Sequence, residues 1–163
     1  MPISSTGSRR RGVTLIELMV ALAIITLIIG ISFPSTIAGM ENLRVSAGAR
    51  SVATFMSVAV NRAERLQQAI EMTVFIKDNR AILRSADGRF AQRLDLPPGV
   101  SMSAVWPPLP EPSDEPRHFL FLPGGTPPRM AIQIANKRGT RRLVRLNPIT
   151  GATEIATPAP EPE

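Results

Sequence analysis

An apolar run near the N-terminus is the feature that most constrains how this chain folds. Residues 13–33 span 21 positions and contain one charged side chain, Glu17. At about 1.5 Å rise per residue, such a helix crosses the roughly 30 Å hydrocarbon core of a bilayer. A carboxylate at the bilayer centre costs roughly 2.5–3.5 kcal/mol, so Glu17 either stays hydrated at the membrane edge or has a functional role. The pattern predicts a transmembrane helix over residues 13–33.

The residues on either side of this run predict its orientation. Residues 9–11 are all arginine, and no further lysine or arginine follows until Arg44. Basic residues stay on the cytoplasmic side, so the N-terminus is expected there and the rest of the chain is expected to be exported. The run is longer than the core of a secretory signal, and the small residues Ala21 and Ala23 lie inside it. A retained anchor is therefore favoured over a removed signal peptide.

The remaining residues are enough for one small domain, and they offer little chemistry. The chain has no cysteine, which excludes disulfides and thiolate metal sites, and its only histidine is His118. We expect His118 to be a structural or surface residue. Gly124 and Gly125 lack the lysine and helix signal of a phosphate loop and indicate a turn. We predict a protein without enzymatic activity, cofactor or metal.

The hydrophobic period then changes from that of a helix to that of strands. Residues 34–71 are predicted to form an amphipathic helix, with Val45, Val52 and Met56 on its apolar face. Residues 72–157 predict a β-rich head, and the Pro/Glu-rich residues 158–163 a disordered tail. The fold class is thus α+β: a long N-terminal helix packed on a small antiparallel β-sandwich or sheet head. The predicted strands are 73–76, 81–84, 90–96, 99–105, 118–122, 130–135, 141–146 and 153–156.

The segment GVTLIELMV at residues 12–20, preceded by a basic leader, resembles the type III signal of type IV pilins and type II secretion pseudopilins. The resemblance implies that residues 1–12 are a leader peptide and that a prepilin peptidase cuts between Gly12 and Val13. It also implies methylation of the Val13 amine and contact of Glu17 with the N-terminus of a neighbouring subunit. Most members begin their mature chain with Phe, and Val13 departs from that pattern.

The C-terminal strands indicate which group of these proteins the chain resembles. The segments 121–125, 130–134 and 142–146, followed by Thr150-Gly151, resemble the closing strands of H-type minor pseudopilins (GspH/FimT-like). This implies a pilin-like fold and a structural subunit of the type II secretion pseudopilus, which takes part in protein export across the outer membrane. Its implied partners are other pseudopilins, the prepilin peptidase and an inner-membrane assembly platform. The implied location is the bacterial inner membrane, with a periplasmic head, and the pseudopilus after assembly.

A basic segment leaves a second function open. No acid lies between Arg117 and Thr153, and five of the basic residues there fall within 137–145: Lys137, Arg138, Arg141, Arg142 and Arg145. Such a hairpin could contact phosphates, and the alternative is a FimT-like minor pilin of a type IV pilus that contacts DNA for uptake. Nucleic-acid binding is the less favoured interpretation, because the segment lacks aromatic residues for base stacking. Otherwise these arginines form a solvated face or meet acids on a neighbouring subunit.

Overall fold

The computed structural model describes residues 14–109 and 115–157, with the side chains of residues 31–38 excepted. The chain divides into two compact units, one ending at Gly39 and one beginning at Met40. One helix, α1 (Leu15–Leu66), contributes residues to both units. All strands of the described residues belong to the second unit.

α1 ends at a left-handed residue. Gln67 has φ 52°, and the amide of Gln68 donates to the carbonyl of Ala63 at 3.3 Å. This is the hydrogen bond of a Schellman-type C-cap, which a residue with positive φ makes possible. We expected the helix to reach Glu71, and that boundary is corrected here. Ile70 and Glu71 instead open strand β1, where Ile70 is fully buried.

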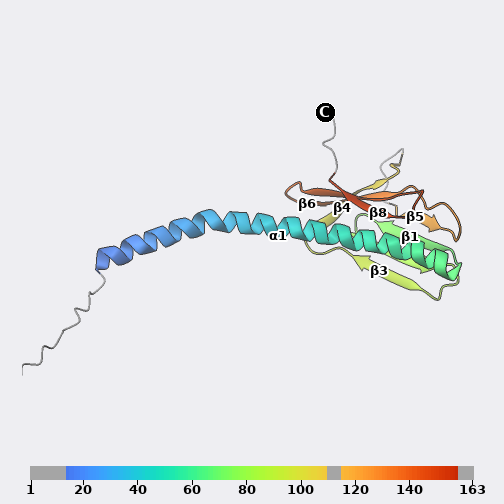
Figure 1. Cartoon of the computed structure of the whole chain (residues 1–163), viewed down its shortest axis with the longest axis horizontal. Helices are drawn as coiled ribbons and strands as arrows, with labels where there is room; N and C mark the ends of the chain where they lie inside the picture. The colour runs from blue at the N-terminus through green and yellow to red at the C-terminus, as the bar shows by residue number, and fades with distance from the viewer. Residues whose placement is uncertain (1–13, 110–114, 158–163) are drawn as a thin grey trace, which may run out of the picture. The chain divides into compact units, whose positions relative to one another are not determined.

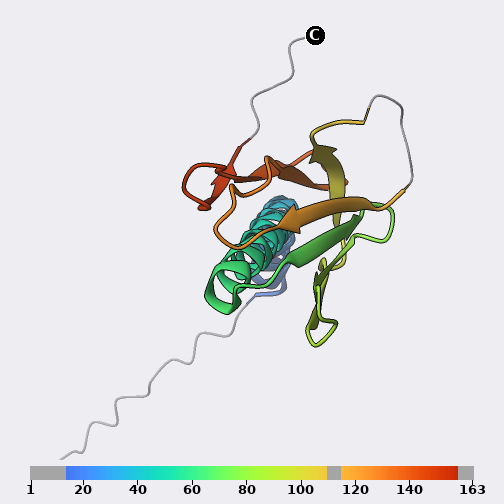
Figure 2. The ribbon, with the colours of Figure 1, turned by 90° about the vertical axis from the view of Figure 1, so that its right-hand side faces the viewer.

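The strands form two antiparallel four-stranded sheets within the described residues. The first sheet has the order β3-β2-β1-β5, and the second has the order β4-β6-β7-β8. Figure 2 shows strands on two sides of the helix. The first sheet contains β1 (Ile70–Phe75), β2 (Arg80–Ser85), β3 (Ala91–Asp95) and β5 (Arg117–Phe121). The second sheet contains β4 (Val100–Trp106), β6 (Ala131–Asn136), β7 (Arg141–Leu146) and β8 (Thr153–Ala156).

The hydrophobic core of the second unit lies between α1 and both sheets (Figure 1). Met56 from the helix, Leu83 from the first sheet and Ile134 from the second are all fully buried. Gly48 allows the helix to approach closely, because a Cβ there would lie 3.1 Å from Cγ1 of Val100. Burial alternates along β1, because every second side chain of this strand faces the core.

The structure confirms the predicted fold class of a helix packed on a small antiparallel β head. Each predicted strand has a counterpart in the same order along the chain, and the ends shift by a few residues. The predicted apolar face is also buried from Val45 to Ala63, while Met40 and Leu66 are about half exposed, at 53% and 50%. The predicted tail, residues 158–163, lies outside the described residues.

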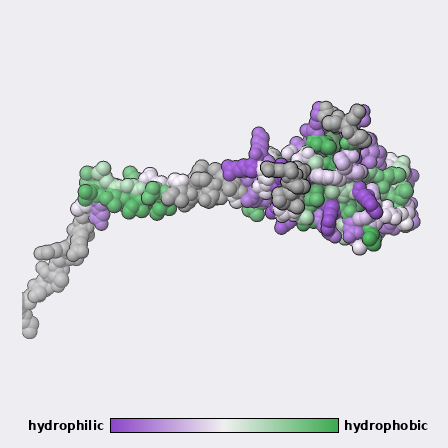
Figure 3. All heavy atoms as spheres, turned by 90° about the horizontal axis from the view of Figure 1, so that it is seen from above, coloured by the Kyte–Doolittle hydropathy of each residue, from purple (hydrophilic) through white to green (hydrophobic). Residues whose placement is uncertain are grey.

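The side chains in the N-terminal part of α1 are mostly apolar and exposed. Its large apolar side chains from Leu15 to Ile29 are each at least 52% exposed. Figure 3 shows the resulting hydrophobic surface. Within the described residues, α1 contains no stretch that meets the length and hydropathy needed to cross a membrane. The transmembrane assignment of residues 13–33 stays a prediction, and Val13 lies outside the described residues.

Candidate functional site

The start of α1 carries the predicted assembly residue, Glu17. Thr14 precedes the helix, and its Oγ1 accepts a hydrogen bond from the Glu17 amide at 3.3 Å. The residues T-L-I-E therefore place Thr14 at the N-cap and Glu17 three positions later, the spacing of a capping box. Glu17 is also in the first helical turn, where a negative charge is favourable. The T-x-x-E spacing is a visible signal for this local role, which the interpretation of Glu17 as an assembly residue did not include.

Glu17 is surrounded by exposed apolar side chains. Ile16 is 70% exposed and Leu18 is 62% exposed, and Glu17 makes no ion pair with any residue that the structure describes. Further along, the Thr26 hydroxyl donates to the carbonyls of Leu22 and Ala23 at 2.8 and 2.9 Å. The polar group of Thr26 is therefore satisfied inside the helix. Between Leu15 and Gly30, Glu17 is the one charged side chain of α1.

Two of the predicted site residues fall outside the described part of the chain. Gly12 and Val13, at the expected cleavage and methylation position, precede the first described residue, Thr14. Their roles stay predictions. The five basic residues from Lys137 to Arg145 are all described, and they lie on the β6–β7 hairpin.

The β6–β7 hairpin does not present its five cations as one free surface. Nε of Arg138 lies 2.8 Å from Oε2 of Glu41, and Nε of Arg145 lies 2.7 Å from Oε2 of Glu154. The hydrogen bond and the charge of Arg145 lower the pKa of Glu154 below its usual value. Arg142 lies on the opposite face of β7 from Arg141 and Arg145, because side chains alternate along a strand. Its guanidinium donates to the Arg141 carbonyl and to Oγ1 of Thr157.

The fold brings an aromatic residue to this hairpin that the sequence did not associate with it. Trp106 of β4 lines a surface depression of about 380 Å³ together with Lys137 and Arg141. β4 and β6 are paired, so Trp106 lies opposite Ala131 across the ladder. This neighbourhood depends on strand pairing between distant segments, and local sequence carries no signal for it.

His118 lies on the outer face of the first sheet. Its Nδ1 is 2.8 Å from Oε1 of Glu71 on the neighbouring strand β1, and the His118 side chain is 58% exposed. It is thus a surface histidine paired across strands, in agreement with the expectation. In the described residues, no group of three His, Cys, Asp or Glu side chains has an arrangement that could hold a metal ion.

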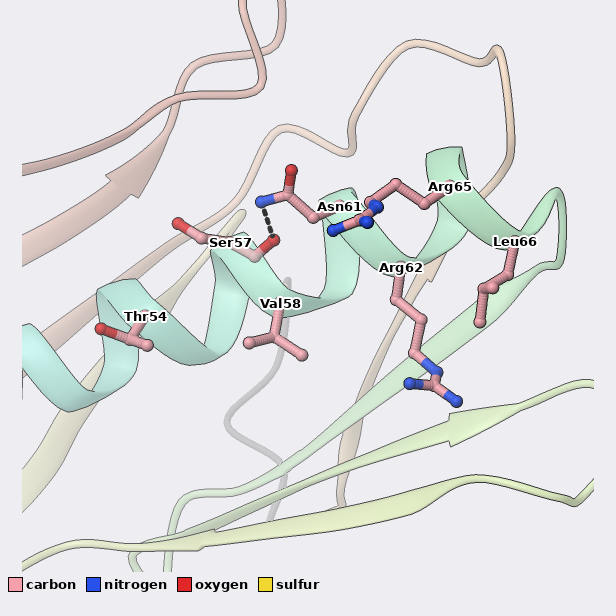
Figure 4. A pocket seen from close by; sticks show the side chains of 7 residues that line it. All are labelled: Thr54, Ser57, Val58, Asn61, Arg62, Arg65 and Leu66. Atoms are coloured by element: carbon pink, nitrogen blue, oxygen red, sulfur yellow. Dashed lines mark hydrogen bonds between the residues drawn. The ribbon is translucent and has the colours of Figure 1, made fainter.

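A second feature that the sequence did not reveal lies on the exposed face of α1. The guanidinium carbon of Arg62 is 3.7 Å from the centre of the Phe90 ring, in the segment before β3. Arg62 also lines a groove of about 750 Å³ on the helix surface (Figure 4). The amphipathic pattern placed Arg62 on the polar face, but the pairing with Phe90 arises only when the first sheet packs on the helix.

Two comparisons with known proteins concern the start of the chain and the sequence as a whole. Residues 7–33 match the family model described as the prokaryotic N-terminal methylation motif. This match contains Gly12, Val13 and Glu17, the three residues that the leader resemblance identified. A search of curated proteins found no significant match.

Among solved structures, the chain is similar to the minor pseudopilin EpsH from the type 2 secretion system of Vibrio cholerae. The TM-score is 0.54 and the sequence identity is 15%, and the alignment covers 72% of this chain and 99% of the EpsH chain. At this identity the similarity establishes the fold. The chain therefore combines the N-terminal methylation motif with the pilin-like fold of a minor pseudopilin.

Proposed function

We propose that this chain is a minor pseudopilin, a structural subunit of a type II secretion pseudopilus that takes part in protein export across the outer membrane. The observation that carries the proposal is the methylation motif at residues 7–33 on a chain with the fold of EpsH. Either feature alone is a less specific indication of function, because the motif describes only the start of the chain and the fold describes mainly the head. A filament subunit needs both, and its role is structural and not enzymatic.

Processing and assembly are linked in this proposal. A prepilin peptidase cuts between Gly12 and Val13, and the new Val13 amine is methylated. Glu17 of one subunit then pairs with the Val13 amine of its neighbour. A lone carboxylate in an apolar surrounding is costly, whereas a carboxylate paired with an ammonium group is far less so. Glu17 is the one charged side chain in the apolar segment 13–33, and so it is the group of that segment that gains from this contact.

The proposed topology follows from the charges and the apolar segment. Residues 13–33 anchor the chain in the inner membrane, the arginines at 9–11 stay cytoplasmic, and the head is periplasmic. After assembly the apolar side chains from Leu15 to Ile29 contact the helices of other pseudopilins. The remaining proposed partners are the prepilin peptidase and an inner-membrane assembly platform.

Replacement of Glu17 by leucine tests the proposal directly. In cells of the native host, Glu17→Leu is expected to be inserted and cleaved normally but to enter filaments at least about tenfold less, because removal of one member of a buried charge pair costs several kcal/mol. Alkaline extraction measures insertion, intact mass measures cleavage and methylation, and cross-linking to other pseudopilins measures incorporation.

Thr26→Leu is the matched control, since it also replaces a polar residue of the same apolar helix by leucine but leaves the carboxylate in place. It is expected to be incorporated like the unmodified chain. Normal incorporation of Glu17→Leu would refute the role of Glu17. A mature chain that does not begin at Val13 would refute the proposed processing.

The DNA-contacting minor pilin is not favoured. Trp106 lines the same depression as Lys137 and Arg141, and this suits that alternative because an aromatic ring can stack on a base. Against it, Arg138 and Arg145 already pair with acids of the same chain. These two cations contribute less to phosphate binding than free arginines would, because their charges are largely neutralised.

A further inference from the structure

The exposed face of α1 near its C-terminal end forms a groove of about 750 Å³. Two rows of side chains line it, each with a spacing of four residues, so the members of a row lie next to one another along the helix. Figure 4 shows Arg62 on one side of this face and Asn61 with Arg65 on the other. The polar row is Ser57, Asn61 and Arg65, and the mixed row is Val58, Arg62 and Leu66.

Arg62 is held in position without an anionic partner. Its guanidinium lies 3.7 Å from the centre of the Phe90 ring, which restricts the side chain. Its Nε is buried and has no hydrogen-bond acceptor, and Arg62 makes no ion pair within the described part of the chain. A buried donor without an acceptor is unfavourable. The Phe90 ring thus restricts the side chain, and the charge of Arg62 has no anionic partner in the described part of the chain.

The charge of the groove indicates what that acceptor is. Arg62 and Arg65 both line the groove, and no acid is among its lining residues. Guanidinium groups bind carboxylates through two parallel hydrogen bonds, so a carboxylate is the matching group. An acidic ligand here would meet two cations and no like charge.

The mixed row also predicts the conformation of the ligand. Val58, Arg62 and Leu66 follow one another at intervals of about 6 Å along the helix axis. Alternate side chains of an extended strand are about 6.6 Å apart, which nearly matches this interval. A segment with the pattern apolar-x-acid-x-apolar can thus place its acid on Arg62 and its apolar side chains on Val58 and Leu66.

We propose that the groove on α1 binds an extended segment of a partner protein with the pattern apolar-x-acid-x-apolar, and that Arg62 binds the carboxylate. The proposal does not depend on the methylation motif, on Glu17 or on incorporation into a filament. It can therefore fail while the proposed function holds, and the reverse is also true.

A peptide titration of the full chain in detergent micelles tests this proposal. The probe is the capped peptide leucine–threonine–glutamate–threonine–leucine, and the matched peptide has glutamine in place of glutamate. Nuclear magnetic resonance follows the Nε–H signal of Arg62 and the backbone amides. We expect the glutamate peptide to shift the Arg62 signal and the amides of residues 57–66, and the glutamine peptide to bind at least about tenfold more weakly.

Variants of Arg62 test whether its guanidinium group binds the glutamate peptide. Arg62→Gln is expected to weaken binding of the glutamate peptide at least about tenfold, and Arg62→Lys less, because lysine keeps the charge but loses the planar fork. Arg84→Gln removes an exposed cation of β2 and is the matched control, with no expected effect. The amide spectrum of each variant shows whether the head remains folded.

Four results would overturn the proposal: equal binding of the two peptides, equal effects of Arg62→Gln and Arg84→Gln, shifts confined to residues 137–145, or no shift at all. A chain shortened after Thr157 tests the other occupant, the acidic residues 158–163 of the same chain. If this truncation alone moves the Arg62 signal and strengthens peptide binding, the groove belongs to that segment and the partner is excluded.

Discussion

At the scale of single residues, Asn79 shows how one side chain connects the two sheets. It has φ 51°, a left-handed conformation that asparagine tolerates better than most residues. Its Oδ1 accepts a hydrogen bond from the amide of Met102 in β4 at 2.8 Å. Its carbonyl accepts another from the amide of Leu96 at 3.1 Å. Asn79 thus forms the β1–β2 turn of the first sheet and also supports the start of the second.

Asn79→Ala is expected to lower the free energy of unfolding by about 1–3 kcal/mol. The variant leaves the Met102 amide without its acceptor. It also places alanine, which has a Cβ but no polar side chain, at positive φ. Chemical denaturation of the full chain in micelles, followed by far-ultraviolet circular dichroism, measures the change. Asn79→Gly removes the same acceptor but accepts positive φ, so it should lose less. If alanine and glycine are equally harmless, the Asn79–Met102 hydrogen bond does not stabilise the head.

At the scale of secondary-structure elements, the end of α1 shows how tertiary burial limits a local pattern. The apolar periodicity continues to Ile70, and so we expected the helix to continue with it. The structure places Ile70 in β1 opposite Ser85 and Phe121, where it is fully buried. Gln67 adopts the left-handed conformation that reverses the chain between helix and strand. The helix ends where burial of Ile70 in the sheet outweighs one more turn of helix.

Gln67→Gly is expected to stabilise the head by about 1 kcal/mol or less, because glycine adopts positive φ without the steric cost of a Cβ. Gln67→Val is expected to destabilise it by about 1 kcal/mol, since a β-branched residue is especially unfavourable there. Thermal unfolding of the three full-length chains in micelles should therefore rank them Gly, Gln, Val from the most to the least stable. A valine variant as stable as the glycine variant would contradict the importance of the left-handed cap.

At the scale of the whole molecule, the head depends on close contact between the helix and both sheets. Gly48 is a position where α1 lies close to the second sheet. A Cβ at Gly48 would lie 3.1 Å from Cγ1 of Val100 and 3.7 Å from Cγ2 of Ile134. These atoms belong to β4 and β6, so any larger side chain at residue 48 pushes the helix away from the second sheet.

Gly48→Val is expected to lower the free energy of unfolding by about 1–3 kcal/mol through overpacking of this contact. Gly39→Val is the control, because a Cβ at Gly39 meets no atom within 4 Å and both glycines lie in α1. Both variants replace a helical glycine by valine, so a lower urea midpoint for Gly48→Val than for Gly39→Val is assigned to the contact with Val100. If the two variants unfold alike, the space at residue 48 is not limiting.

Much of the fold could be predicted because its signals are local. The two-residue period of β1 and the Asn147–Gly151 turn depend on neighbouring residues, and the structure has a strand and a turn there. The T-x-x-E spacing at Thr14 is equally local. The basic hairpin was predicted as an element. The sequence carried no signal for the pairing of Arg138 with Glu41 or of Arg145 with Glu154, because both acids lie outside the acid-free segment 117–153.

Three features can be read from the amino-acid order alone: the leader motif, the apolar segment after it, and the change from helical to strand periodicity. These follow from covalent order and from the preferences of each short segment for its own backbone. Three other features arise only in the folded chain: the end of α1 at Leu66, the ion pairs of Arg138 and Arg145, and the contact of Arg62 with Phe90. The physical reason is that burial and ion pairing act between side chains that are far apart in the chain and adjacent only after folding.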